Sequence, residues 1–355
     1  MQHTPKPGRL ARYAQVALWI FAVGAVAALC LADLLPQWLA TRSQPYLTLA
    51  VGSFIIETLQ FHIGAACLLC LAVAVAGKRW RLALVSAMGV VMGLAPTASL
   101  LITREAPAPA GATMRLMSMN VHVHNRNAAA VLASVRRAKP DVLALQEYSV
   151  TMDDAIRDEL ADEYPYQLRK PRQNSGDGWA IYSRRPLLAP IDTSLRLDQS
   201  KRQARFAVRM GDKEVVIYAL HLTSPQSVEQ IGRNRAEVAD LLELVAQESM
   251  PVILAGDFNF TETTANAAAL RALGLRNTHD LAGSGRGSTW RYRKLGITHR
   301  LPGFRIDHVF IGPQLTCTHS RVLDTFGSDH RPIIADIALA APEMAERDEA
   351  VASVE

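Results

Sequence analysis

Residues 252–260 combine a carboxylate and an amide in a pattern suited to phosphate chemistry. Residues 252–255 form an apolar run of strand type, and Gly256, Asp257 and Asn259 follow directly. The glycine lets the backbone turn sharply. Side chains two apart in a strand share one face, so we expect Asp257 and Asn259 to point the same way. A carboxylate can hold a hard cation or take a proton, and an amide can donate a hydrogen bond to a phosphate oxygen.

The same design, an apolar strand that leads into polar residues, recurs between residues 114 and 340. Eight polar side chains lie at or beside the ends of predicted strands: Asn120, Glu147, His221, Asp257, Asn259, Asp307, Asp329 and His330. Any one of them alone would be interpreted as a turn former or a hydrogen-bonded histidine. Eight in distinctive local sequences favour a single shared site.

Strands and helices alternate in this region. Strands are predicted at residues 114–123, 142–145, 179–183, 304–311 and 333–339, with a hairpin at 205–220 around Gly211-Asp212. Helices are predicted at residues 127–138, 153–161, 227–247 and 264–273. This interleaving indicates an α/β sandwich with helices outside two packed sheets.

Six short motifs resemble, in order, those of the endonuclease/exonuclease/phosphatase superfamily. They are Met119-Asn120, Leu145-Gln146-Glu147, Ala219-Leu220-His221, Gly256-Asp257-Phe258-Asn259, Arg305-Ile306-Asp307-His308 and Ser328-Asp329-His330-Arg331-Pro332. That superfamily includes pancreatic-type deoxyribonuclease, abasic-site endonucleases, neutral sphingomyelinases and inositol polyphosphate 5-phosphatases. The resemblance covers residues 114–340. It implies a four-layered α/β sandwich, two packed mixed sheets flanked by helices, and a Mg2+-dependent phosphoesterase.

The resemblance also implies the metal ligands. Glu147 matches the principal ligand, with Asn120 beside it and Asp329 in the metal network. Mg2+ is the expected ion and Mn2+ the alternative, since a hard cation prefers carboxylate and water ligands. No close cluster of Cys and His occurs in this region, which argues against zinc.

Catalytic roles follow from the same resemblance. His330, oriented by Asp307, matches a general base or phosphate-contacting histidine, and Asp257 matches the group that activates or positions the attacking water. The choice of base between Asp257 and the His330–Asp307 pair stays open. His221 matches a general acid and phosphate contact of the deoxyribonuclease and sphingomyelinase branches.

Two further residues are candidate phosphate contacts. Asn259 matches the phosphate-binding amide of the superfamily, and Arg205 is a candidate in a looser local sequence. The abasic-site branch has a catalytic tyrosine where this chain has Ser175-Gly176-Asp177. Abasic-site repair is therefore disfavoured.

Residues 1–103 form a region of different composition, with sparse charges and long apolar runs. Three transmembrane helices are predicted at about residues 14–35, 54–76 and 82–102. A cleaved signal peptide is the alternative for the first, but its apolar run is longer than the ~7–15 residues usual for one. Basic residues flank the first helix and fill the loop between the second and third: Lys6, Arg9, Arg12, Lys78, Arg79 and Arg81. This bias places the amino terminus in the cytoplasm and everything after residue 103 outside it.

Glu57 and His62 are ionisable residues at the second predicted span, where such groups are often functional. The favoured interpretation is a helix that starts near Glu57, which would then lie among lipid headgroups. Residues 104–113, with Pro107 and Pro109, are predicted to be a linker, and residues 341–355 a disordered acidic tail.

The sequence therefore predicts a membrane-anchored, Mg2+-dependent phosphoesterase of the cytoplasmic (inner) membrane, similar to membrane-attached bacterial members of the superfamily. Its expected partners are the lipid bilayer and a phosphate-containing substrate, lipid or nucleic acid, and no protein partner is predicted. An extracytoplasmic metal-dependent endonuclease or exonuclease is the alternative, and a non-catalytic membrane scaffold a third. The net charge of +5 does not decide between them, because several basic residues flank the apolar segments.

Overall fold

The computed structural model describes residues 9–34, 44–98, 111–192, 197, 202–291 and 303–340. The chain divides into two compact units, Met1–Ser99 and Leu100–Glu355, which are described separately. The predicted tail and all but the last three residues of the predicted linker lie outside the described residues.

Three long helices make up the first unit: α1 (Arg9–Leu34), α2 (Gln44–Ala76) and α3 (Trp80–Ala98). Each contains a segment long and apolar enough to cross a membrane: Arg12–Ala32, Val51–Ala76 and Trp80–Ala98. Helices α2 and α3 approach closely at Gly64 and Gly93, where a Cβ on either residue would collide with the backbone of the other. Small residues allow this kind of close packing between apolar helices.

One prediction about the second helix differs from the structure. Helix α2 begins at Gln44, well before Glu57, so the interpretation that it starts near Glu57 was wrong. Glu is a good helix former, so the helix continues through Glu57. Its buried carboxylate accepts a hydrogen bond of 2.5 Å from Ser53 Oγ one turn earlier. Helix α3 is described as far as Ala98, and its predicted end at residue 102 lies outside the described residues.

Two six-stranded mixed sheets form the centre of the second unit. The first has the order β11-β12-β1-β2-β4-β3 and the second the order β5-β6-β7-β8-β10-β9. Strands β1 and β2 pair in parallel, as do β7 and β8, and the other pairs are antiparallel. The bounds are β1 Thr113–Asn120, β2 Val142–Gln146, β3 Tyr166–Lys170, β4 Trp179–Ser183, β5 Leu188–Asp192, β6 Ala204–Met210, β7 Lys213–His221, β8 Val252–Asp257, β9 Arg276–Asn277, β10 Asp307–Ile311, β11 Leu315–Val322 and β12 Ile333–Leu339.

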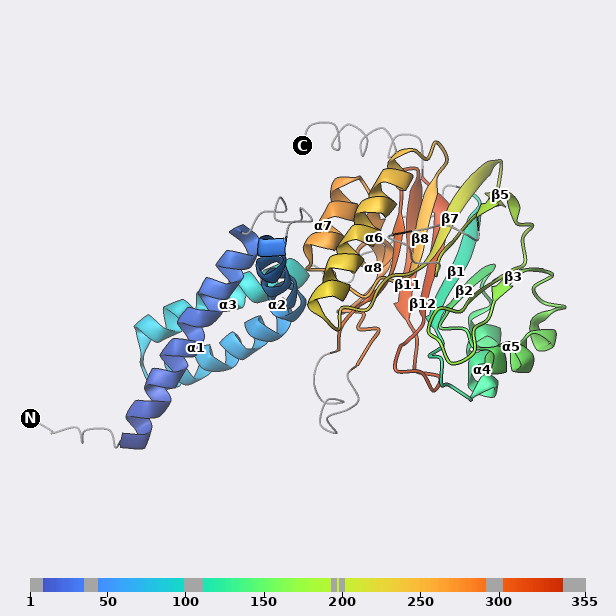
Figure 1. Ribbon diagram of the computed structural model, residues 1–355. Coiled ribbons are helices and arrows are strands. Elements are labelled where there is room, and N and C mark those ends of the chain that lie inside the picture. Colours follow the sequence, from blue (N-terminus) through green and yellow to red (C-terminus); the bar gives the residue numbers. More distant parts are fainter. Residues whose placement is uncertain are drawn as a thin grey trace, which may run out of the picture. The chain divides into compact units, whose positions relative to one another are not determined.

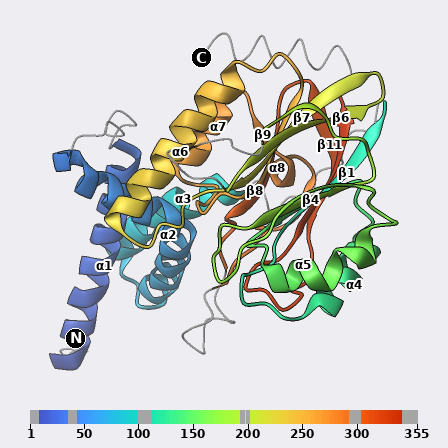
Figure 2. The same ribbon diagram turned by 45° about the vertical axis from the view of Figure 1, so that its right-hand side comes forward.

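Helices cover the outer faces of both sheets. Helices α4 (Ala128–Ala138) and α5 (Val150–Ile156) lie beside the first sheet, and α6 (Val228–Ala246) and α7 (Ala265–Ala272) beside the second (Figures 1 and 2). The short helix α8 (Thr278–Ala282) contacts β11. Ser227 caps α6, since its Oγ accepts a hydrogen bond from the N–H of Gln230. The four-layered α/β sandwich predicted from the sequence is therefore confirmed.

Strand alternation sorts the apolar side chains into two cores. On β1, Met114 and Leu116 pack between the sheets, whereas Met117 and Met119 pack under α4 and α5. The inner faces of β7, β8 and β10 likewise contribute to the core between the sheets. Because alternate residues share a face, the polar residues that end these inner faces also point between the sheets: Asn120, His221, Asp257 and Asp307.

Gly256 lies inside β8 and serves a close approach between strands, which differs from the predicted turn after the strand. Its φ is +154°, and a Cβ would collide with the carbonyl oxygen of Leu220 on β7. Gly274 also has a positive φ, +84°, but no atom lies within 4 Å of its Cβ position.

We expect Gly256→Ala to lower the free energy of unfolding by about 3–5 kcal/mol, because backbone strain and a backbone collision combine. Gly274→Ala should cost only about 1–2 kcal/mol, since strain acts alone there. Guanidinium titration of the purified full chain in detergent measures both values. Equal losses would show that the collision at Gly256 is relieved without cost.

Candidate active site

The polar ends of several strands meet at one rim of the sandwich. The carboxyl ends of β1 and β2 in the first sheet, and of β7 and β8 in the second, converge there. Strand β10 runs antiparallel to β8 and begins at this rim, with Asp307 opposite Asp257. The segment before β12 contributes Asp329 and His330.

Asn120 joins the carboxylates of the two sheets. Its Nδ2 donates to Glu147 Oε1 at 3.0 Å and to Asp257 Oδ2 at 2.9 Å, and its Oδ1 accepts from the N–H of His122 at 3.0 Å. Asn120 and Asp257 are both about 1% exposed. The amide therefore places its donor group between two negative groups that would otherwise repel. Its predicted role as a metal ligand stays a prediction.

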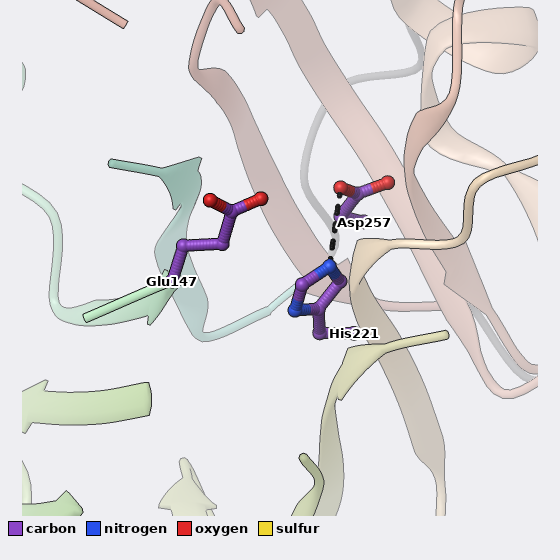
Figure 3. A group of neighbouring side chains, drawn as sticks. All are labelled: Glu147, His221 and Asp257. Carbon is purple, nitrogen blue, oxygen red and sulfur yellow. Dashed lines mark ion pairs between the residues drawn. The ribbon is translucent and has the colours of Figure 1, made fainter. Parts of the chain in front are cut away.

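Glu147 follows β2 in a left-handed conformation, with φ of +53°. Its Oε2 accepts a hydrogen bond of 3.0 Å from the N–H of Val123. Its side chain points toward the same space as those of His221 and Asp257 (Figure 3). A non-glycine residue in this region of φ is uncommon and frequently marks a functional site.

The imidazole of His221 is held in one tautomer. Its Nδ1 lies 3.1 Å from the carbonyl oxygen of Gly176, so Nδ1 donates, and its Nε2 lies 3.7 Å from Asp257 Oδ2 (Figure 3). Burial lowers the pKa of His221 well below its ordinary value, and the nearby charge of Arg202 lowers it further. In the neutral form Nε2 is an acceptor, so the predicted general-acid role requires this atom to gain a proton first.

His330 has a carboxylate on each side. Its Nδ1 donates to Asp307 Oδ2 at 2.9 Å, and its Nε2 lies 3.8 Å from Asp257 Oδ2. Burial lowers the pKa of His330, but Asp307 and Asp257 outweigh this effect and raise it to about 10. The structure thus brings the predicted His330–Asp307 pair together, and the backbone N–H of Asp307 donates to Thr289 Oγ1 at 3.0 Å.

Asp257 lies between the two histidines. Burial, followed by the negative charge of Asp307, raises the pKa of Asp257 to about 7. A carboxyl group with a pKa near neutrality can exchange a proton with a water molecule at physiological pH.

The donor set fits a hard divalent cation. Ligand atoms of Glu147, His221 and Asp257 lie within 4.8 Å of one another, as do those of Asp257, Asp307 and His330. Asp329 accepts from Trp290 Nε1 at 3.1 Å through Oδ2, while its Oδ1 is buried and has no hydrogen-bond partner among the described residues. Carboxylate oxygens suit Mg2+ or Mn2+.

The two predicted phosphate contacts differ in position. Asn259 lies just after β8 in a turn with φ of +55°, and its Nδ2 donates to the carbonyl oxygen of Leu222 at 3.0 Å. The guanidinium of Arg205 instead bonds both carboxylate oxygens of Glu248, at 2.6 and 2.9 Å. Arg205 is therefore engaged away from the rim residues, which corrects its predicted role.

Two residues outside the predicted site lie beside it. Arg202 donates to Thr223 Oγ1 at 2.8 Å, two residues beyond His221, and Trp290 donates to Asp329. Neither stands in a distinctive motif. By sequence, Arg202 and Arg205 are equally plausible phosphate contacts. Only the structure distinguishes them, because Arg205 forms an ion pair with Glu248.

We expect Asp307→Asn to lower the pKa of His330 in protein freed of metal by chelation. The Asp307 carboxylate stabilises the protonated imidazole, so its removal makes the proton easier to lose. Histidine side-chain NMR across a pH series measures the shift, with the resonance assigned from His330→Gln. Asp154→Asn, at an exposed position on α5, should leave the titration unchanged. An unchanged pKa in Asp307→Asn would contradict the pairing.

Solved structures share this fold at low sequence identity. An endonuclease/exonuclease/phosphatase from Bacteroides vulgatus superimposes with a TM-score of 0.54 at 15% identity, covering 64% of this chain and 99% of that one. The human Nocturnin catalytic domain with bound sulfate gives 0.51 at 16% identity, covering 66% and 97%. The 3′ phosphatase NExo from Neisseria, bound to a product DNA hairpin, gives 0.50 at 19% identity, covering 62% and 98%.

Sequence comparison identifies the family. No curated protein matches the chain. The family model described as Endonuclease/Exonuclease/phosphatase family matches residues 117–330, which is more than half of the chain and contains all eight predicted rim residues. The chain therefore belongs to the endonuclease/exonuclease/phosphatase family of metal-dependent hydrolases.

Proposed function

We propose that the chain is a membrane-anchored phosphoesterase that uses Mg2+, or Mn2+ in its place, to hydrolyse phosphate ester or anhydride bonds outside the cytoplasm. The observation that carries the proposal is the convergence of polar side chains at this rim of the sandwich. Asn120, Glu147, His221, Asp257, Asp307 and His330 come from six separate segments and lie within hydrogen-bond or ion-pair distance of at least one other member of the group.

Different side chains at the rim would serve different steps of hydrolysis. Asp257, with a pKa near neutrality, is a group that can take a proton from an attacking water. His330, whose pKa is raised to about 10 beside Asp307, carries a proton at neutral pH and could act as the base only after losing it. Asn259 and His221 would contact the phosphate. A divalent cation held by Glu147 with Asp329 and Asn120 would neutralise charge on the phosphate oxygens.

A lipid phosphate or pyrophosphate is the substrate class that the chain organisation favours. Residues 1–103 would anchor the protein through three membrane helices, and residues 104–113 would link them to a catalytic domain at 114–340. The 14 residues between α3 and β1 can extend at most about 50 Å. This connection would hold the domain near the lipid headgroups, where a lipid substrate is concentrated.

An extracytoplasmic nuclease is the second candidate. It is favoured by the likeness of fold to NExo, whose structure contains a product DNA hairpin. A non-catalytic scaffold is disfavoured, because the rim retains a full set of carboxylate, amide and imidazole groups.

We expect the purified full chain in detergent to hydrolyse a phosphodiester in the presence of Mg2+, and to lose this activity with EDTA. His330→Ala should lower the rate by about 10²–10⁴-fold, the typical contribution of a proton-transferring side chain. His319→Ala, at an exposed position on β11, is the matched control and should keep the wild-type rate.

The substrate comparison uses four probes: bis(4-nitrophenyl) phosphate, plasmid DNA, sphingomyelin or phosphoinositide vesicles, and a polyprenyl pyrophosphate. Phosphate release from a lipid supports the leading proposal, and nicking of DNA without lipid turnover supports the nuclease. Absence of metal-dependent turnover on all four would leave only the scaffold.

We expect a cysteine introduced by Asp324→Cys to react with a membrane-impermeant maleimide in intact cells, because the catalytic domain is outside the cytoplasm. The Asp324 side chain is 93% exposed, and native Cys317 is buried, so the unmodified chain provides the background. A cysteine introduced by Gln2→Cys should react only after permeabilisation. The opposite pattern would reverse the proposed topology.

A further inference from the structure

The segments that carry His221 and Asp257 continue side by side beyond the ends of their strands. Strands β7 and β8 pair as far as His221 and Asp257, and the N–H of Leu222 still donates to the carbonyl oxygen of Asp257 at 2.9 Å. Regular pairing stops there, since Asn259 turns with a positive φ. Beyond it, one direct hydrogen bond joins the two segments, from Asn259 Nδ2 to the carbonyl oxygen of Leu222 at 3.0 Å. A further interaction is needed to hold Thr223 and Phe258.

Asn234, in the middle of α6, supplies that interaction. Its Nδ2 donates to the carbonyl oxygen of Thr223 at 2.8 Å and to that of Phe258 at 3.0 Å. Its Oδ1 accepts from Asn266 Nδ2, on α7, at 2.7 Å. The side chain is fully buried. An amide has two N–H donors, and here one holds each segment.

Glu237, one turn further along α6, fixes the first segment a second time. Its Oε2 accepts from the N–H of Thr223 at 2.6 Å and its Oε1 from Thr223 Oγ1 at 3.0 Å. Arg202 lies 3.6 Å from Glu237 Oε1 and provides the positive charge that a fully buried carboxylate requires. Thr223 is thereby held through its amide, its hydroxyl and its carbonyl.

We propose that Asn234 is a positioning residue for hydrolysis at this site, which fixes the distance between His221 and the Asp257–Asn259 segment. The inference rests on the proposed function. Asn234 touches neither substrate nor metal, and it acts through Thr223 and Phe258, which neighbour the groups that do. A misplacement of about 1 Å in such a group can lower a rate by about 100-fold.

Asn234→Asp tests the proposal, because it keeps the size of the side chain and removes both donors. We expect kcat for bis(4-nitrophenyl) phosphate to fall by about 100-fold while KM changes by less than about threefold. Asn234→Ser retains one donor and should lower kcat by about tenfold, which keeps the test usable if the aspartate variant does not fold.

Val238→Ala is the matched control for lost stability. Val238 is buried on the same helix and makes no hydrogen bond to either segment through its side chain. This variant should lose stability yet keep wild-type kcat per folded molecule. All measurements use the full chain in detergent with Mg2+.

A second measurement does not depend on activity. The imidazole resonances of His221, assigned from His221→Gln, should shift in the Asn234 variants and not in Val238→Ala. If the wild type lacks activity but these resonances shift, the proposed function fails, while the placement of His221 by Asn234 stands. If kcat in the Asn234 variants equals that of Val238→Ala and the His221 resonances do not move, the positioning role is overturned.

Discussion

The buried carboxylate of Asp257 is the constraint on which the rest of the site depends. It belongs to the second sheet, yet its Oδ2 accepts a hydrogen bond from Asn120 of the first sheet. Glu147 and Asp307 add negative charge beside it. Burial of several like charges is unfavourable unless donors or cations compensate. Asn120, His330 and, in the proposed function, a divalent cation are the groups that do so.

This constraint explains why the site needs both sheets and the helix behind one of them. Parallel pairs at the centre of each sheet deliver their carboxyl ends to one rim, but neither pair alone assembles the set. The packing of the sheets brings Asn120 to Asp257. Beyond the strand ends, polar groups of α6 hold the chain where sheet hydrogen bonding has stopped. The outer helix layer thus helps to hold the geometry of the candidate site.

Much of the architecture could be predicted, because many buried strands and amphipathic helices have a recognisable apolar pattern in the sequence. Strands β4 and β12 have the predicted bounds, and α6, predicted at residues 227–247, spans Val228–Ala246. Strands β3, β5, β9 and β11 were not predicted. Strands β3 and β5 are partly exposed and lack a clear apolar pattern, and β9 has only two residues. Strand β11 is mostly polar in sequence and its register shifts between Cys317 and His319. Gly256 was correctly singled out, but its reason is the approach of Leu220 within the sheet.

The sequence by itself determined the residue types, their order and the face each would occupy in a strand, because side chains alternate with a period of two. The motif at residues 305–308 indicated Asp307 as a site residue. In the structure His308 lies on the opposite face of β10 and contacts the carbonyl oxygen of Phe260. Only the tertiary structure decided which distant groups pair. Glu248 engages Arg205, while Glu237 and Thr223 engage Arg202. Such choices depend on register and packing between segments far apart in the chain, and local patterns carry no information about either.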